Sequence, residues 1–415
     1  MAYLDRDRAA RLMAEAGLDA LLLLTPESFT YATGASPGVG AMWRRAGAVA
    51  ALVPADPSLA IGAVVSDLHA ESFRASSDVT DLRIHPLWVE TADLRPYDLT
   101  QPVPELVAAA WAGAGRKAGF ARPETFDASH GFRLAGDLLA SRTLSAARVG
   151  IELDSLSVSD FALLTDVLPG CRLIDGSDVL RRLKMVKSVQ EIDHLRTAVR
   201  LSEVGIEALA EAIAPGQTRD ALAAVWTSAV QTAARAENIR HLTGHWEYVS
   251  VGDNPWSRGG VVEAGSLIKV DVGCLVQGYT SDTGRTFVCG EPNAVQSRLF
   301  SALSHAFEAG LAQIRPGNEM RRVHEAATAA MTEAGFPGYS RGHFGHGLGA
   351  GLGSEEWPFF SATSRVVLEP GMVVAFETPW YVDGVGGMII ENQLLITPDG
   401  HETMNRLPTG LVAIR

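Results

Sequence analysis

Four carboxylates in apolar, strand-forming sequence constrain the fold of this chain more than any other feature. Each has Val, Ile, Phe, Tyr or Thr among its close neighbours; they are Asp271, Asp282, Glu377 and Glu391. A buried carboxylate without a partner is costly, and several close together repel one another. The fold must therefore bring positive charge to them. Four ionised carboxylates would balance two divalent cations, so the residue set favours a two-metal site.

A histidine belongs to the same set. His346 lies in Gly345–Gly349, where the short neighbours allow close backbone approach. Oxygen-rich ligation with a single imidazole suits manganese, iron, cobalt or zinc better than copper, and we expect manganese. Taken singly, each of the five residues is typical of an edge strand, a turn or a loop. Their order and spacing together favour a metal centre.

Charge and composition exclude several other classes of protein. The 415 residues include 48 acidic and 35 basic side chains, a formal net charge of −13, which argues against nucleic acid or an anionic membrane as partner. Three cysteines are too few for a disulfide framework. No apolar run reaches the ~20 residues of a membrane helix, and charge near the N-terminus replaces a signal peptide's apolar stretch. We expect a cytoplasmic protein.

The chain divides into two halves of different pattern. Residues 5–16, 103–112 and 131–141 predict helices, and 18–24, 46–53 and 60–65 predict strands, which indicates an α/β N-terminal domain. We place its boundary so that the domains are 1–178 and 179–415. Ser188 and Glu191 have the spacing of a capping box. Helices there precede strands predicted at 266–273, 278–288, 364–369, 372–378 and 387–396, with helices at 293–314 and 318–334, which indicates an α+β C-terminal domain.

The order Asp, Asp, His, Glu, Glu, with gaps of 11, 64, 31 and 14 residues, resembles the pita-bread metallohydrolases. These include methionine aminopeptidase, Xaa-Pro aminopeptidase, prolidase and the creatinase-like enzymes. The likeness extends to the segments around the ligands and to a creatinase-type N-terminal domain. It rests on Gly278–Phe287, Gly345–Gly349, Leu368–Met372 and Ile390–Asn392, and on Gly17–Leu21 and Thr30–Gly34 in the first half.

The resemblance implies a C-terminal pita-bread domain that binds two divalent ions, bridged by Asp282 and Glu391. Asp271 would complete one site, and His346 with Glu377 the other. It also implies a metal-activated water that attacks an amide carbonyl, with Glu377 moving the proton, and a homodimer. The expected activity is that of a hydrolase of the Xaa-Pro aminopeptidase and prolidase-like class, acting on a short peptide or another small molecule.

Several positions depart from the peptidases. The two usual substrate histidines are replaced by Asn254 and Gly353, an arginine before the last ligand by Ile389, and a threonine after the second aspartate by Gly284. Either other residues make the substrate contacts of these missing side chains, or the substrate differs. Candidate replacements are His343 as a catalytic group, with His245, Trp256, Glu356 and Trp357 as substrate contacts.

Two alternatives therefore stay open. One is a non-peptidase pita-bread enzyme acting on a small metabolite, like dimethylsulfoniopropionate lyase, ectoine hydrolase or creatinase. The other is a binding protein built on an inactive enzyme, against which the full ligand set argues.

Overall fold

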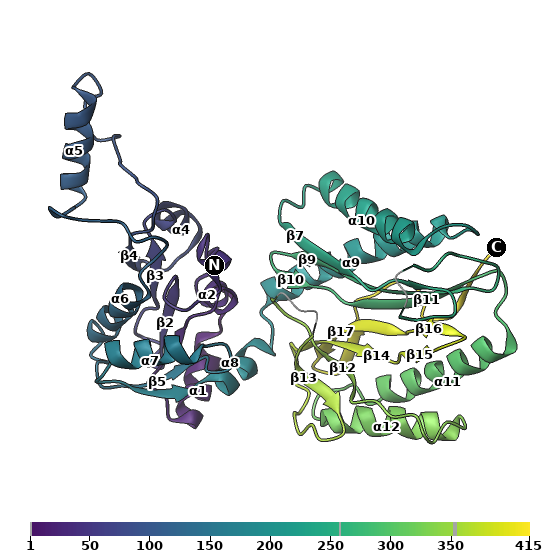
Figure 1. Ribbon diagram of the computed structural model, residues 1–415. Helices are drawn as coiled ribbons and strands as arrows, with labels where there is room; N and C mark the ends of the chain where they lie inside the picture. The colour runs from purple at the N-terminus through teal and green to yellow at the C-terminus, as the bar shows by residue number, and fades with distance from the viewer. Residues whose placement is uncertain (1, 257–258, 352–354) are drawn as a thin grey trace. The chain divides into compact units, whose positions relative to one another are not determined.

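The computed structural model describes residues 2–256, 259–351 and 355–415, and the chain forms two compact units (Figure 1). They are Met1–Leu183 and Lys184–Arg415. Helix α8 (Ser177–Lys184) runs across the boundary that the sequence placed between residues 178 and 179. Its basic side chains suggest a linker, but Val179, Leu180 and Leu183 on the other face are buried.

A mixed six-stranded sheet forms the centre of the N-terminal unit, in the order β4-β3-β2-β1-β5-β6. The strands are β1 (Ala20–Leu23), β2 (Ala50–Pro54), β3 (Gly62–Ser66), β4 (Asp81–His85), β5 (Arg148–Ile151) and β6 (Arg172–Asp175). The helices are α1 (Arg6–Ala16), α2 (Pro26–Thr33), α3 (Gly40–Trp43), α4 (Ala70–Ser76), α5 (Val103–Gly113), α6 (Ala128–Ala140) and α7 (Val158–Val167). The α/β expectation for this half is confirmed.

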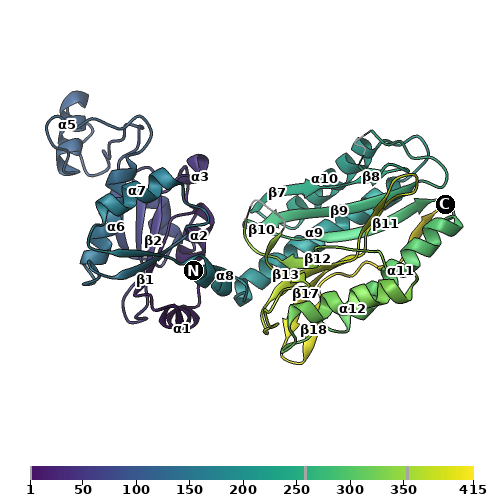
Figure 2. The same cartoon turned by 60° about the horizontal axis from the view of Figure 1, so that its bottom comes forward.

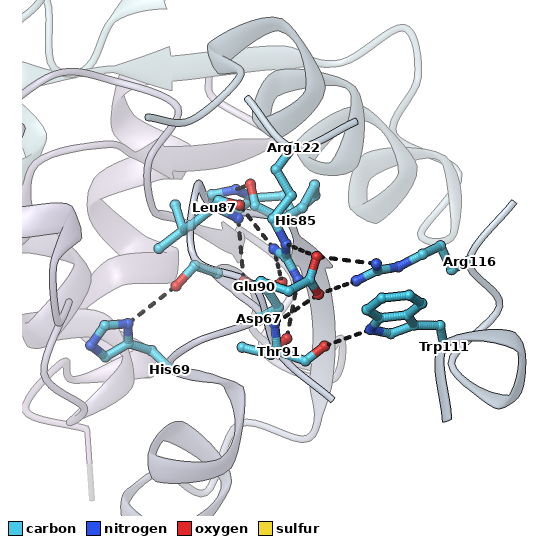
Figure 3. A network of polar contacts seen from close by, with 11 residues as sticks. Asp67, His69, His85, Leu87, Glu90, Thr91, Trp111, Arg116 and Arg122 are labelled. Atoms are coloured by element: carbon cyan, nitrogen blue, oxygen red, sulfur yellow. Dashed lines mark hydrogen bonds and ion pairs between the residues drawn. The ribbon is translucent and has the colours of Figure 1, made fainter. Parts of the chain in front are cut away.

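Ion pairs order the long segment that carries α5, and one of them ties this segment to the rest of the unit (Figure 3). Arg122 donates to Asp67 Oδ2 at 2.7 Å, and Arg116 donates to Glu90 Oε2 at 3.1 Å. The indole of Trp111 packs under the Arg116 guanidinium, 4.3 Å from it. These contacts account for the charged residues of the segment as local structure.

Two larger sheets, each covered by a pair of helices, and a two-stranded sheet of β15 and β16 form the C-terminal unit (Figures 1 and 2). One has the order β10-β9-β11-β19, with β7 and β8 also paired to β9, and α9 and α10 pack against it. The other has the order β13-β12-β14-β17-β18, and α11 and α12 lie beside it. Strands β11 and β17 lie next to each other where the sheets meet. This arrangement confirms the α+β pita-bread expectation.

The bounds of these elements follow chain order. The helices are α9 (Val189–Ala212), α10 (Arg219–Ala236), α11 (Ala294–Leu311) and α12 (Met320–Glu333). The strands are β7 (Leu242–Glu247), β8 (Ser250–Val251), β9 (Leu267–Val276), β10 (Tyr279–Thr280), β11 (Thr283–Cys289), β12 (His343–Gly347), β13 (Glu356–Ser361), β14 (Val373–Glu377), β15 (Trp380–Val382), β16 (Gly386–Met388), β17 (Glu391–Thr397), β18 (Gly400–Thr403) and β19 (Val412–Ile414).

Local signals in the sequence explain the helix starts, and one predicted strand is wrong. The Ser188–Glu191 capping box begins α9, as predicted.

Residues 364–369 do not form a strand of either sheet. Their backbone instead bonds to the loop before α12, with Met320 N donating to Val366 O and Leu368 N to Asn318 O. Within the described residues, no helix is both long and apolar enough to cross a bilayer.

Candidate metal centre

The five predicted ligands come from strands and links that converge where the two sheets meet. Asp271 lies in the middle of β9, and Asp282 lies in the short link between β10 and β11. Glu377 at the end of β14 is the register partner of Glu391 at the start of β17, and His346 on β12 lies opposite Ala375 of β14. Strand pairing thus brings residues separated by up to 120 positions into one region.

Three of the five form a tight buried cluster. The ligand atoms of Asp282, His346 and Glu391 all lie within 4.8 Å of one another. His346 Nε2 is 3.5 Å from Asp282 Oδ2. Asp282 Oδ1 is buried and has no hydrogen-bond partner among the described residues. Two carboxylates, one of which has an unpartnered buried oxygen, and one imidazole fit a divalent cation of the manganese, iron, cobalt or zinc group.

The ring of His346 is oriented for such a role. Its Nδ1 lies 2.9 Å from Gly347 O. A carbonyl only accepts, so Nδ1 carries the proton and Nε2 keeps its lone pair toward the cluster. Gly345 makes the position possible: its φ is +124°, and a Cβ there would lie 2.1 Å from Ala375 O. Only glycine lets β12 come this close to β14.

The carboxylates are held in an unfavourable electrostatic state. Burial, reinforced by Asp271 and Glu377, raises the pKa of Asp282 well above its usual range. Burial and the neighbouring Asp282 and Glu377 raise the pKa of Glu391 in the same way. Burial also raises the pKa of Glu377, although Arg341 and His346 oppose it. Each carboxylate would gain from a cation at this point.

Two cationic side chains beside the cluster, buried Lys269 and partly exposed Arg341, were not among the predicted site residues. Lys269 Nζ lies 3.0 Å from Asp271 Oδ2, and Arg341 Nη2 donates to Glu377 Oε1 at 2.5 Å. Burial opposes the charge of Lys269, but the combined attraction of Asp271, Tyr381 and Glu391 outweighs burial, so the pKa of Lys269 is raised. The alternation of β9 is a signal that could have found Lys269, because residues 269 and 271 share a face.

A further arginine, Arg285, hydrogen-bonds to the strand that carries Glu391. Buried Arg285 donates to Glu391 O at 2.5 Å and to Asn392 Oδ1 at 2.9 Å. Burial lowers the pKa of Arg285 to about 10, against the attraction of Glu203 and Glu391. These bonds fix the backbone on which Glu391 stands.

Of the predicted substrate-handling residues, His343 lies beside the centre. Its Nδ1 is 3.9 Å from Glu377 Oε1, and its Nε2 is 3.8 Å from Glu355 Oε2. The ring centroids of His343 and His346 are 6.2 Å apart. Burial, together with Arg341, lowers the pKa of His343, which favours the neutral imidazole.

Trp256 contributes to a cavity of about 510 Å³ next to the centre. Its ring lies 4.7 Å from that of Tyr381, and Tyr339, Trp380 and Phe336 add further aromatic surface. Arg341 joins this cavity to Glu377. Asn254, at the position of a usual family histidine, accepts a bond from Trp256 N and so supports that wall.

Three other candidates lie elsewhere in the same unit. His245 is exposed on β7 opposite Cys274, on the helix-covered face of β9 and away from Asp271. Glu356 has its carboxylate 3.9 Å from Lys187 Nζ. Trp357 packs against the core beneath the second sheet. None of these three side chains belongs to the buried cluster of Asp282, His346 and Glu391. Gly353 lies outside the described residues.

The fold and the buried acidic cluster together define a metal-dependent hydrolase with a creatinase-like N-terminal unit and a pita-bread catalytic unit. Residues 193–398 match metallopeptidase family M24, and residues 6–186 match the creatinase/prolidase N-terminal domain. The chain belongs to metallopeptidase family M24, and it is a prolidase-like metallohydrolase.

Curated relatives carry dipeptidase names. A probable dipeptidase PepE of Mycobacterium bovis is 32% identical over 278 residues, covering 66% of this chain and 73% of the relative. An Xaa-Pro dipeptidase of Pyrococcus horikoshii is 28% identical over 247 residues, covering 57% and 66%.

Solved structures agree on the fold over nearly the whole chain. An Xaa-Pro dipeptidase from Bacillus anthracis aligns with a TM-score of 0.75 at 20% identity, covering 99% of both chains. The dipeptidase PepE from Mycobacterium ulcerans aligns with a TM-score of 0.73 at 24% identity, covering 98% of this chain and 96% of the other.

Proposed function

We propose that the protein hydrolyses Xaa-Pro dipeptides or similar short peptides with a divalent metal, manganese for preference, held at Asp282, His346 and Glu391. The observation that carries the proposal is the buried cluster of these three side chains, with Asp282 Oδ1 unpartnered. A bound divalent ion would acidify water and stabilise the oxyanion that develops on the scissile carbonyl. The dipeptidase names of the relatives support a peptide substrate.

Glu377 and His343 are the groups proposed to handle protons. Glu377 lies next to the cluster, and burial raises the pKa of its carboxyl, which makes it the candidate to take up and release a proton. His343, 3.9 Å away and neutral, can accept or relay that proton toward the leaving nitrogen. Arg341 fixes the Glu377 carboxylate from the cavity side, which positions both groups relative to a substrate in the aromatic cavity.

The two-ion arrangement expected from the sequence requires Asp271 and Glu377 as additional ligands. In this structure each of them is paired with a cationic side chain, Asp271 with Lys269 and Glu377 with Arg341. Two features rest on the sequence and the family resemblance: we propose a homodimer, checked by light scattering on the purified protein, and a cytoplasmic location.

The test is product analysis by mass spectrometry with manganese-loaded protein and a pooled panel of Xaa-Pro dipeptides and tripeptides. We expect cleavage that chelator abolishes and manganese restores. Asp282→Asn should remove both the activity and the bound metal. Full activity in that variant would refute the proposed centre, and intact peptides with metal-loaded wild-type protein would refute the peptidase assignment.

The aromatic cavity favours one alternative function. Ring faces of Trp256, Tyr381 and Trp380 suit a cationic small molecule, such as the sulfonium of dimethylsulfoniopropionate, as well as a proline ring. Dimethylsulfoniopropionate, ectoine and creatine therefore belong in the same panel. Turnover of one of them with the peptides intact would select the non-peptidase class.

A further inference from the structure

Two cations built into the candidate metal centre already balance part of its charge. Asp271 is paired with Lys269 and Glu377 with Arg341, whereas no lysine or arginine of the described residues lies within salt-bridge distance of Asp282 or Glu391, and Asp282 has only the neutral imidazole of His346 nearby. The pairs involve the two carboxylates that lie outside the tight cluster. Asp282 and Glu391 therefore still lack a neutralising cation, whereas Asp271 and Glu377 already have one.

Lys269 is fixed inside the centre by its surroundings. Residues 268, 270 and 272 of β9 face the core under α9 and α10, so residues 269 and 271 face the opposite side together. The Lys269 side chain is 5% exposed, and its Nζ lies 5.3 Å from the centre of the Tyr381 ring. A Cβ placed at Gly387 would lie 3.3 Å from Lys269 Cβ, so the backbone of β16 covers the lysine stem.

The charge that remains corresponds to one divalent ion. Four ionised carboxylates carry four negative charges, and the ammonium of Lys269 and the guanidinium of Arg341 offset two of them. The remaining two lie on Asp282 and Glu391, which with His346 form the only metal-type cluster found among the described residues. A second divalent ion beside Asp271 would have to displace the Lys269 ammonium or lie against it, and like charges at such distances repel strongly in a buried site.

We propose that this chain binds one divalent ion tightly, at Asp282, His346 and Glu391, and that the Lys269 ammonium on Asp271 occupies the place of a second. The proposal rests on the proposed metal centre and concerns the number of ions in it. Lys269 is thus a positioning residue that sets the metal stoichiometry.

Metal content is the measurement that tests it. Protein loaded with excess Mn²⁺ and desalted is analysed by inductively coupled plasma mass spectrometry. We expect one ion per chain in the wild type, two in Lys269→Met and none in Asp282→Asn. Lys187→Met is the matched control, because Lys187 is also buried in this unit but lies beside Glu356, and its content should remain one.

Electron paramagnetic resonance of the manganese-loaded wild type adds a readout that needs no variant. We expect the hyperfine pattern of an isolated Mn²⁺ ion, whereas an exchange-coupled pair would overturn the proposal even if Lys269→Met fails to fold. Two ions in the wild type, or one ion in a folded Lys269→Met, would also overturn it. A wild type without metal would overturn the centre itself. One ion with no peptide cleavage would support the stoichiometry and refute the peptidase function.

Discussion

Replacing Asp282 with asparagine should stabilise the metal-free protein while it removes metal binding. Asp282 Oδ1 is buried without a partner, and the carboxylate lies among Asp271, Glu377 and Glu391. A buried unsatisfied polar group costs about 1–3 kcal/mol, and more when charged. The asparagine Nδ2 can donate to Glu391 instead. We therefore expect the free energy of unfolding of metal-free Asp282→Asn to exceed that of the wild type by about 2 kcal/mol.

Thermal unfolding of the wild type and Asp282→Asn, with and without manganese, measures this difference in stability. For a unit of the size of Lys184–Arg415, about 2 kcal/mol corresponds to a Tm roughly 4–8 °C higher. Manganese at about 100 times its Kd stabilises the wild type by about 2.7 kcal/mol and the variant not at all. The order of the two Tm values should therefore reverse when metal is added.

Glu203→Gln is the control in the same unit. Glu203 is also buried, but its carboxylate accepts from Arg406 N and Leu407 N at 2.9 Å and from Asn405 Nδ2 at 3.2 Å. Its replacement should destabilise the protein by about 1.5–3 kcal/mol, with or without metal. If metal-free Asp282→Asn were also less stable than the wild type, the argument from carboxylate repulsion would be wrong.

The difference in Tm between the metal-free wild type and metal-free Asp282→Asn should depend on pH. Because the pKa of Asp282 is raised on folding, its protonation favours the folded state: that stability is fully present below the unfolded pKa of about 4 and is lost as pH rises through the folded pKa. The Tm advantage of metal-free Asp282→Asn should therefore be small at about pH 4 and widen toward neutral pH. A constant advantage would assign the effect to packing.

Two further variants test the geometry around the ligands. His343→Ala should lower kcat by about 10²-fold or more while metal content stays unchanged, because the residue lies beside Glu377 and outside the cluster; an unchanged kcat would remove His343 from the mechanism. Gly345→Ala should cost at least about 2 kcal/mol in urea unfolding, since its Cβ would meet Ala375 O at positive φ, whereas Gly400→Ala, with open space around it, should stay within about 0.5 kcal/mol. Equal costs at the two glycines would refute the close-approach argument.

The sequence predicted the fold, and it predicted that the five candidate ligands would lie in one region, because the residue types and their spacing follow a family pattern. Carboxylates in strand-forming segments at family-like spacing are visible without a structure, and strand pairing then brings Glu377 opposite Glu391 as register partners. The strand predicted at 364–369 is wrong because a local apolar pattern does not reveal the tertiary partner of a segment, and here the backbone bonds to the loop before α12.

The positive charges of the centre were harder to predict. Acids and histidines are the residue types that bind metal, whereas a lysine in a strand-forming segment carries no metal-site signal of its own. Alternation along β9 places it beside Asp271, and this could have been inferred. Arg341 is different, because its pairing with Glu377 joins the segment before β12 to the end of β14 and depends on tertiary structure.

Gly284 and Ile389, two departures from the peptidases that look independent in the sequence, belong to one change in packing. A Cβ at Gly284 would lie 2.8 Å from Ile389 Cδ1 and 2.9 Å from Glu391 Cβ. With isoleucine at 389, a threonine at 284 would press on the backbone that carries Glu391, so the smaller residue on β11 accommodates the larger one before β17. The loss of the threonine is therefore a consequence of Ile389 and adds no separate argument against peptide chemistry. The case for a changed substrate then rests on Ile389 itself, on Asn254 and Gly353 at the two histidine positions, and on the aromatic wall that Asn254 supports through Trp256.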